Sequence, residues 1–240
     1  MWVIVRPKPK LMQSVNYFNT HGFPITGFAP IDIKTNIEAI SALNNALVGT
    51  SVDSLIVTST ESVSRLKPLL TAKQSGLKCY CIGSSSAALL IETDLQCMVP
   101  NPQNSEGIIN LPSLQQVRDQ HFALVKGVGG RELIADTLRS RGAQVSEFDV
   151  YQRILLTNPV CSSPIDWDQV TGLLVSSRAL VDAVVGSVGL DLLKNKVWVG
   201  VSNRVSEHGR AIGIKEFHSS DGASDAHLLG WLNRQGRGQT

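Results

Sequence analysis

The segment HFALVKGVGGRELIADTLRSRGAQVSEFDVYQR, residues 121–153, contains the clearest run of secondary-structure signals in the chain. Residues 122–125 are a short apolar run, which predicts a buried strand. A glycine-rich turn follows at 127–130, and from Leu133 the apolar residues have helical spacing. Residues 143–150 then predict a second strand that ends at the close of the segment. Strand, glycine turn, helix and strand in this order predict a βαβ unit.

The helix start after the glycine turn is a candidate anion site, because helix N-termini present unpaired N–H groups. A P-loop would need Gly-Lys-Ser/Thr where Gly130, Arg131 and Glu132 stand. A dinucleotide fingerprint would need a small residue in place of Glu132, although Asp149 lies near the spacing of a ribose contact. A third interpretation is a carboxylate site formed by the amides of Gly129 and Gly130 with Arg131. A tight turn that needs glycine only for its backbone conformation remains equally open.

Composition is that of a globular protein of one large or two small domains, with 240 residues, 42% of them hydrophobic. The net charge of +2 gives no general electrostatic case for binding nucleic acid or a membrane. The apolar start at 1–5 is too short for a signal peptide, and no run of about 18 apolar residues is present. We therefore expect a cytoplasmic protein without a membrane-spanning helix.

The four cysteines are expected to be free thiols in a reducing cytosol. Cys79 and Cys81 would point to the same face of one strand. No Cys/His pair has zinc-finger spacing, so no metal site is expected.

Strands and helices alternate along most of the chain, and two parts of it resemble each other. Residues 53–59 resemble 171–177, and 81–84 resemble 199–202, each segment being a strand that meets a hydroxyl-rich helix start. Two similar α/β halves are the natural interpretation. Residues 157–166 contain several Pro, Ser and Asn residues and predict a loop or linker.

The glycine-rich segment closely resembles the signature of the uroporphyrinogen-III synthase family. The resemblance is carried by Lys-Gly-x-Gly-Gly-Arg-Glu-Leu at 126–133 and by Val-Tyr-Gln-Arg at 150–153, with Lys126 in place of the usual first arginine. It extends over nearly the whole chain, from Arg6-Pro7 onwards. The largest departure is at 201–205, where Ser202 replaces a glycine and Val205 a threonine, so that Ser202 or Arg204 would have to substitute.

This resemblance implies an α/β fold of two flavodoxin-like domains, each a parallel sheet with helices on both faces, joined by a two-strand linker. Residues 1–33 plus 156–240 would form a discontinuous domain, and 34–150 an inserted one. The crossing segments would lie at about 25–35 and 147–157. The cleft between the domains would hold the active site.

The resemblance also implies a lyase that cyclises hydroxymethylbilane to uroporphyrinogen III, with loss of water and inversion of the terminal pyrrole ring, in tetrapyrrole biosynthesis. It implies no cofactor, a monomer, and hand-over of the substrate from the preceding deaminase. Tyr151 would be the general acid, and the cleft would mainly position the rings. The substrate carboxylates would be bound by helix starts, hydroxyls and a few cations at Arg6, Thr58, Ser59, Gly83, Ser84, Ser86, Lys126, Gly127, Gly129, Gly130, Arg131, Ser176, Ser177, Ser202 and Arg204.

Two other functions are compatible with the residues. One is a non-catalytic two-domain ligand-binding module, because no obvious acid/base pair is present. The other is a nucleotide-binding oxidoreductase that uses the glycines at 127–130.

Overall fold

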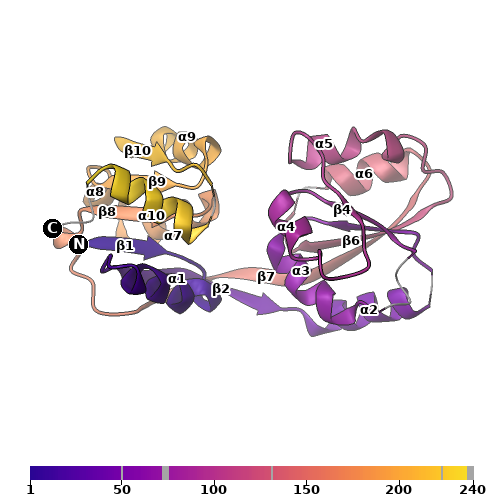
Figure 1. The fold of residues 1–240 in the computed structure, drawn as a ribbon, viewed down its shortest axis with the longest axis horizontal. Helices are drawn as coiled ribbons and strands as arrows, with labels where there is room; N and C mark the ends of the chain where they lie inside the picture. The colour runs from indigo at the N-terminus through magenta and orange to yellow at the C-terminus, as the bar shows by residue number, and fades with distance from the viewer. Residues whose placement is uncertain (50, 72–75, 131, 223, 237–240) are drawn as a thin grey trace. The chain divides into compact units, whose positions relative to one another are not determined.

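The computed structural model of the chain describes residues 1–49, 51–71, 76–130, 132–222 and 224–236. The chain divides into two compact units. Unit 1 contains residues 1–33 and 154–240, and unit 2 contains residues 34–153. Each unit is an α/β structure built on parallel strands (Figure 1). Within the described ranges, no helix has both the length and the apolar character needed to cross a membrane.

Unit 1 has five strands in the order β2-β1-β8-β9-β10, and every neighbouring pair is parallel. The strands are β1 (Trp2–Val5), β2 (Thr26–Thr35), β8 (Gly172–Val175), β9 (Val197–Gly200) and β10 (Glu216–Ser219). β2 extends by two residues into unit 2. The short strands β1 and β8 are buried at every residue, as expected for parallel strands covered on both faces.

Helices cover both faces of this sheet. Trp2 and Ile4 of β1 point to the face packed by α1 (Lys8–Thr20) and α10 (Asp225–Arg234). Val3 and Val5 point to the other face, packed by α7 (Arg178–Val188), α8 (Leu190–Leu193) and α9 (Asn203–Ala211). The alternation of side chains along a strand therefore divides the apolar core of unit 1 into two layers. A 3-10 turn, η4 (Trp167–Gln169), precedes β8.

Unit 2 also has five strands, in the order β7-β6-β3-β4-β5, and its neighbours are again parallel. They are β3 (Ser54–Val57), β4 (Lys78–Cys81), β5 (Cys97–Met98), β6 (His121–Gly127) and β7 (Gln144–Cys161). The helices are α2 (Ile37–Val48), α3 (Thr60–Leu66), α4 (Ser84–Ala88), α5 (Ser105–Ile109) and α6 (Leu133–Ser140). Two 3-10 turns, η1 (Lys67–Leu69) and η3 (Pro112–Leu114), complete the described elements.

One face of the unit 2 sheet packs against α5 and α6. Ile56, Tyr80, Phe122 and Leu124 form a cluster there with Ile108, Leu114, Val117, Ile134, Ala135 and Leu138. The intervening residues of the same strands point to the opposite face and are also buried.

The two strand orders correspond position by position. β1 and β2 of unit 1 occupy the places of β6 and β7 in unit 2, while β8, β9 and β10 occupy those of β3, β4 and β5. The turn at Arg6 after β1 is therefore the counterpart of the glycine turn after β6. The same correspondence pairs β8 with β3 and β9 with β4, the strands whose sequences resemble each other.

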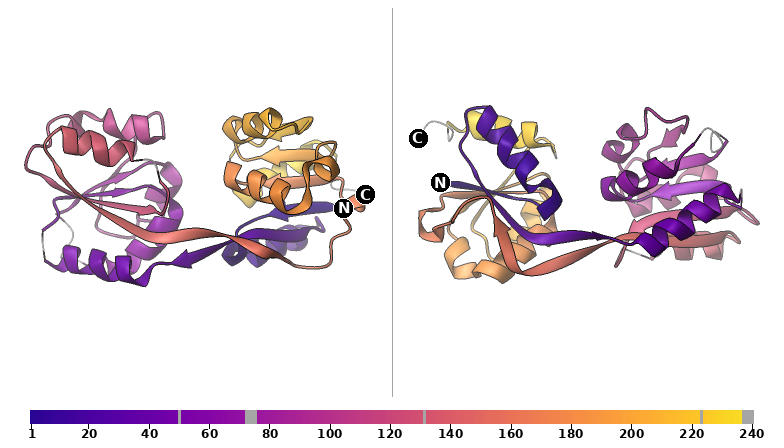
Figure 2. Two further views of the ribbon diagram at one scale, coloured as in Figure 1. Left: turned by 180° about the vertical axis from the view of Figure 1, so that it is seen from behind. Right: turned by 90° about the horizontal axis from the view of Figure 1, so that it is seen from below.

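The prediction of a loop at 157–166 is wrong over its first half, since β7 continues to Cys161. β7 is 18 residues long and, with β2, carries the chain between the units (Figures 1 and 2). The Ser162 amide donates to the Gly27 carbonyl (3.0 Å), so backbone pairing with β2 overrides a loop-like composition. Strand 143–150 also continues past its predicted end, and α8 was not predicted at all.

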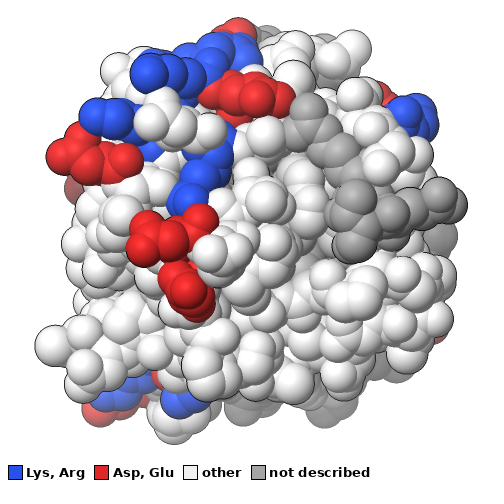
Figure 3. Space-filling view, turned by 90° about the vertical axis from the view of Figure 1, so that its left-hand side faces the viewer, with Lys and Arg blue, Asp and Glu red and all other residues white. Residues whose placement is uncertain are grey.

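Charged side chains are interleaved on the face of unit 1 drawn in Figure 3. Lysine and arginine lie beside aspartate and glutamate there, and much of the face is uncharged. This mixture is consistent with the nearly balanced 22 basic and 20 acidic residues of the chain.

Candidate functional site

The carboxyl ends of the unit 2 strands meet at one edge of the sheet. Val57 of β3 pairs with Cys81 of β4 on one side and with Val125 of β6 on the other. The turns after these three strands therefore share that edge, as in other parallel sheets where ligands bind beyond the carboxyl ends of the strands. The edge carries Thr58 and Ser59, the Gly83 turn and the glycine turn.

A bulge between β6 and β7 determines the position of Tyr151. Lys126 pairs with Asp149, but the next residue, Gly127, pairs with Tyr151, so the register shifts by one residue. The Val128 amide donates to the Tyr151 carbonyl (2.9 Å) and holds the strand in this register. A Cβ atom at Gly127 would lie 2.5 Å from Cζ of Tyr151. Glycine is required at 127 because the Tyr151 ring lies directly against its backbone.

The hydroxyl of Tyr151 links β7 to the start of α3. It lies 3.1 Å from the hydroxyl of Ser59, and Arg153 donates a hydrogen bond of 3.1 Å to it. The guanidinium carbons of Arg65 and Arg153 are each 5.3 Å from the centroid of the Tyr151 ring. Two cations at this distance interact favourably with the electron-rich ring. Since Tyr151 accepts from Arg153, its own proton is available for donation.

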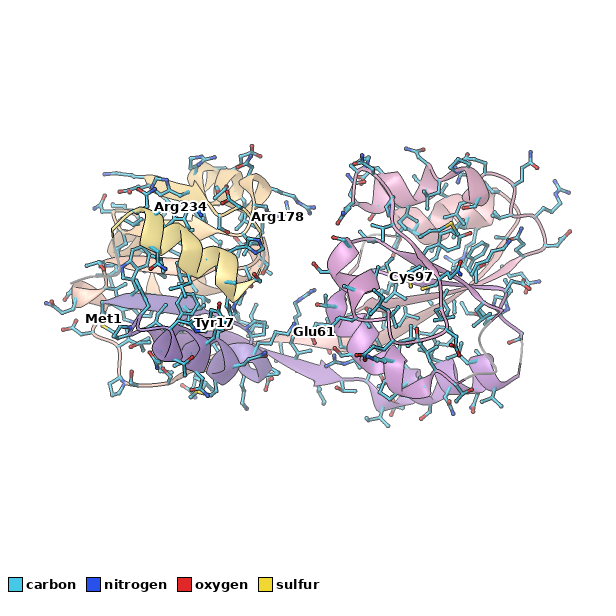
Figure 4. The ribbon with its side chains drawn as sticks, viewed as in Figure 1. Met1, Tyr17, Glu61, Cys97, Arg178 and Arg234 are labelled. Carbon is cyan, nitrogen blue, oxygen red and sulfur yellow. The ribbon has the colours of Figure 1, made fainter. Side chains whose placement is uncertain are left out.

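Tyr151 itself is buried, with 2% of its surface exposed. β7 continues for ten residues beyond Tyr151, so this residue lies within the strand and not at its end. Ser59 caps α3 by accepting from the Ser62 amide at 3.1 Å. Arg65 is held on the same helix by Glu61, at 3.0 Å, the residue labelled in Figure 4.

Lys126 is buried and paired with two carboxylates of β7. Its Nζ lies 3.0 Å from Oδ1 of Asp149 and 3.2 Å from Oε2 of Glu147. Burial alone would lower the pKa of Lys126, but hydrogen bonds to Asp149 and Glu147 raise it above its ordinary value. Burial likewise favours a higher pKa for Glu147, yet its hydrogen bonds with Arg139 and Lys126 lower it. The ammonium that was predicted to bind substrate is therefore already neutralised within the sheet.

The glycine turn has the conformation that glycine allows. Gly129 has φ +76°, and the Gly130 amide donates to the Gly127 carbonyl at 3.3 Å. This long internal hydrogen bond occupies the amide that was predicted to bind a carboxylate. α6 begins at Leu133, and Arg131 lies outside the described residues.

The other predicted turns of unit 2 are held by local hydrogen bonds. Thr58 Oγ1 donates to the Val125 carbonyl at 3.4 Å. The amide and hydroxyl of Ser84 both donate to Oε1 of Gln103, at 3.0 and 3.3 Å. Ser86 is buried, and its amide donates to the Gly83 carbonyl at 3.0 Å.

Unit 1 has a matching edge, where Val5 pairs with Val175 and Val175 with Gly200. The predicted residues that follow these strands are Arg6, Ser176, Ser177, Ser202 and Arg204. Ser177 caps α7, while Ser202 is exposed and makes no side-chain capping bond. Ser176 is half-buried and Arg204 is exposed.

Arg6 differs from the others in being buried within a polar network. Its Nε donates to Ser14 Oγ at 3.1 Å, and its Nη2 pairs with Asp225. Ser14 also donates to Asp225, at 2.8 Å. The network joins β1, α1 and α10, which is a structural role.

A pocket of about 330 Å³ adjoins the glycine turn within unit 2. It is lined by Val128 of that turn, by Gln152 next to Tyr151, and by the segment 34–38 at the start of α2. Asn36 caps α2 by accepting from the Ala39 amide at 3.1 Å.

Sequence reasoning missed Arg65, Gln103 and Glu147 as neighbours of the predicted residues. Glu147 could have been found from its spacing, since it lies two residues before Asp149 on the same strand. Arg65 and Gln103 reach the edge from separate elements, and no local pattern indicates that.

Of the predicted residues in unit 2, the structure brings Tyr151, Ser59 and Gly127 into contact, with Lys126 adjacent along β6. This arrangement provides a buried phenol with a proton to donate and two flanking cations. Such a group can serve as a general acid or orient a polar substrate.

Comparison with known proteins gives a consistent result. The family described as uroporphyrinogen-III synthase HemD matches residues 14–230. The uroporphyrinogen-III synthase of Escherichia coli K12 is 26% identical over 246 residues, covering 95% of this chain and 97% of that protein. That of Proteus mirabilis is 35% identical over 165 residues, covering 64% of this chain and 80% of the relative.

Solved structures show the same fold. A mutant uroporphyrinogen III synthase from the extremely thermophilic bacterium Thermus thermophilus has a TM-score of 0.66 at 16% identity, with 99% of each chain covered. The uroporphyrinogen-III synthetase of Helicobacter pylori 26695 has a TM-score of 0.56 at 14% identity, covering 98% of this chain and 100% of that one. Because the family match spans most of the sequence, this chain belongs to the uroporphyrinogen-III synthase family.

Proposed function

We propose that this protein cyclises hydroxymethylbilane to uroporphyrinogen III, with loss of water and inversion of the terminal pyrrole ring. Membership of the family gives the reaction, and the environment of Tyr151 is the observation in the molecule that supports it. A buried phenol beside Ser59 and Arg153 is a proton donor placed at the carboxyl edge of a parallel sheet.

Tyr151 is proposed to assist departure of the substrate hydroxyl. The pyrrole nitrogen already assists departure of this hydroxyl. We therefore expect Tyr151 to accelerate the reaction by a factor at the low end of the roughly 10²–10⁴-fold that is typical of general acids. The harder requirement is control of the position of attack, because the electrophile must attack the substituted carbon of the last ring. We attribute that step to positioning of the rings, which needs no side chain of special reactivity.

The acetate and propionate groups of the substrate are proposed to bind at the hydroxyl-rich turns. Support comes from the position of these turns at the carboxyl ends of the parallel strands in each unit. Ser202 and Arg204 are the most accessible of the predicted residues in unit 1. Lys126 and Arg6 are the weakest candidates, since each is paired with carboxylates of the protein.

We also propose that each unit is a flavodoxin-like domain, with the chain crossing at about 25–35 and 147–157. The strand order supports this, because the five strands of unit 1, numbered along the chain, follow the flavodoxin order 2-1-3-4-5. Unit 2 has the same order if numbering begins at β6. A cytoplasmic monomer that needs no cofactor and receives substrate from the preceding deaminase completes the proposal.

The decisive experiment supplies freshly made hydroxymethylbilane to the purified, dialysed protein and separates the product isomers. We expect uroporphyrinogen III to be the main product, whereas the spontaneous reaction without protein gives isomer I. Isomer I alone would contradict the proposed activity, while binding of the bilane without turnover would favour the ligand-binding alternative. Activity that required an added nicotinamide cofactor would favour the oxidoreductase alternative.

A further inference from the structure

Three cysteine thiols gather on one face of the unit 2 sheet. Cys79 and Cys81 alternate along β4 and therefore share a face, while Tyr80 between them points into the cluster with α5 and α6. β5 adds the third thiol, because Cys97 pairs directly with Cys79 in the parallel register. Residues paired across neighbouring strands point to the same face, so topology brings together thiols that lie 18 residues apart.

The sulfur atoms are close enough to share one ion. All three Sγ atoms lie within 4.8 Å of one another, and those of Cys79 and Cys97 are 3.0 Å apart. Bonds of about 2.3 Å to a d¹⁰ ion would place three coplanar sulfurs about 4 Å apart, which small side-chain rotations provide. Figure 4 labels Cys97 in unit 2. In the described part of the chain, no histidine or carboxylate belongs to this group.

We propose that Cys79, Cys81 and Cys97 form a site for one soft, thiophilic cation, with Cu⁺ as the best match. Thiolates select soft ions such as Cu⁺ and Zn²⁺. Zn²⁺ in protein sites is nearly always four-coordinate, whereas the described protein offers three ligands here. Cu⁺ is satisfied by three sulfurs.

The site has an entry route from solvent. Cys79 and Cys81 are fully buried, but Cys97 is partly exposed on β5, the edge strand of unit 2. Each thiol that binds the ion releases its proton to solvent.

The test uses the fully reduced, full-length protein under anaerobic conditions, titrated with Cu⁺ against a chromophoric Cu⁺ chelator. One equivalent should bind, and Cys97→Ala should weaken binding by more than about 100-fold, because loss of even an outer-shell partner costs 10–100-fold. Cys161→Ala is the matched control, since this exposed thiol on β7 lies outside the cluster and its loss should leave affinity unchanged.

Cys79→Ala gives a second variant at a fully buried position, and the urea midpoint of each variant shows whether it has folded. Equal Cu⁺ affinity in wild type, Cys97→Ala and Cys79→Ala would overturn the proposal. A 79–97 disulfide that persists in the reductant, seen as two free thiols out of four, would also overturn it. Displacement of Cu⁺ by an equal concentration of Zn²⁺ would overturn the choice of ion.

Discussion

The hydroxyls of Tyr151 and Ser59 lie 3.1 Å apart although 92 residues separate them in the chain. β3 and β7 are both parallel neighbours of β6, so the residue that caps α3 meets a residue of β7. The bulge at Gly127 is what turns the tyrosine toward Ser59. The site thus depends on one register shift as well as on the identity of its side chains.

Tyr151→Phe is expected to lower the rate of uroporphyrinogen III formation by about 10²-fold, the low end for a general acid. The ring still packs against Gly127, so most product should remain isomer III. Loss of the hydroxyl removes two hydrogen bonds, each of which contributes about 0.5–1.5 kcal/mol to the free energy of unfolding. Rate, isomer ratio and urea midpoint are measured on one preparation. If Tyr151→Phe forms product at the wild-type rate, Tyr151 does not act as the acid. If the variant forms mainly isomer I, the hydroxyl serves instead to position the last ring.

Gly127→Ala is expected to displace the Tyr151 ring, because the new methyl would lie 2.5 Å from Cζ. Overpacking of this kind costs about 1–3 kcal/mol, and activity should fall at least as far as in Tyr151→Phe. Gly130→Ala is the matched control, since its nearest neighbour would be the Gly127 carbonyl at 3.4 Å, an ordinary contact. Thermal unfolding and rate would be compared for both. Equal stability and equal rate in the two variants would contradict this prediction, because the Tyr151 ring would then move away from the new methyl without cost.

Lys126→Met is expected to destabilise the protein by about 1–3 kcal/mol, because it leaves Glu147 and Asp149 without their shared cation. KM should change little if the Lys126 ammonium is paired with these carboxylates and does not bind substrate. Lys67→Met is the control. Its ion pair with Glu92 is exposed to solvent and should contribute little to stability. A large rise in KM for Lys126→Met at unchanged stability would instead make Lys126 a substrate ligand.

Arg6→Met is expected to cost about 3 kcal/mol of unfolding free energy, the low end for breaking a buried ion pair, since Asp225 retains some exposure. Among the described residues, Ser14 is then the side chain that still donates a hydrogen bond to Asp225. If the role is structural, Asp225→Asn should produce a comparable loss, and neither variant should alter KM. Urea unfolding and steady-state kinetics on both variants make the comparison. An increase in KM confined to Arg6→Met would restore Arg6 as a carboxylate ligand.

The strand and helix pattern was readable from the sequence because short buried strands and capped helix starts are local signals. Asn36 and Ser177 cap helices as their positions indicate. The length of β7 was not readable, because Asn158 and Pro159 have loop-like composition and the pairing that keeps them extended comes from distant β2.

The candidate site could be predicted only in part, because contacts between distant segments also determine it. The motif indicates Tyr151 and Gly127, but no local signal shows that the Tyr151 ring packs on the backbone of Gly127. The pairing of Lys126 with Asp149 follows from strand register, which sequence spacing does not fix. The approach of Cys97 to Cys79 is another consequence of register alone.

Glu147 makes the stability of the fold sensitive to acid pH. Hydrogen bonds with Arg139 and Lys126 hold the folded-state pKa of Glu147 below its ordinary value. The group therefore stabilises the fold at pH above its unfolded pKa of about 4.3, and this contribution is lost as pH falls through the lower folded pKa. Lys126 has a raised pKa, so its own contribution persists at acid and neutral pH and is lost only in strongly alkaline solution.

Glu147→Gln should therefore unfold at lower urea than wild type at pH 7, and the two curves should converge below about pH 4. Glu207→Gln, a change at an exposed position on α9, is the control and should follow wild type throughout. Urea midpoints measured from about pH 3 to pH 8 at constant ionic strength give the comparison. A gap between Glu147→Gln and wild type that stays constant down to the acid end of this range would contradict the ionic explanation, because the lost interaction would then not depend on the charge of Glu147.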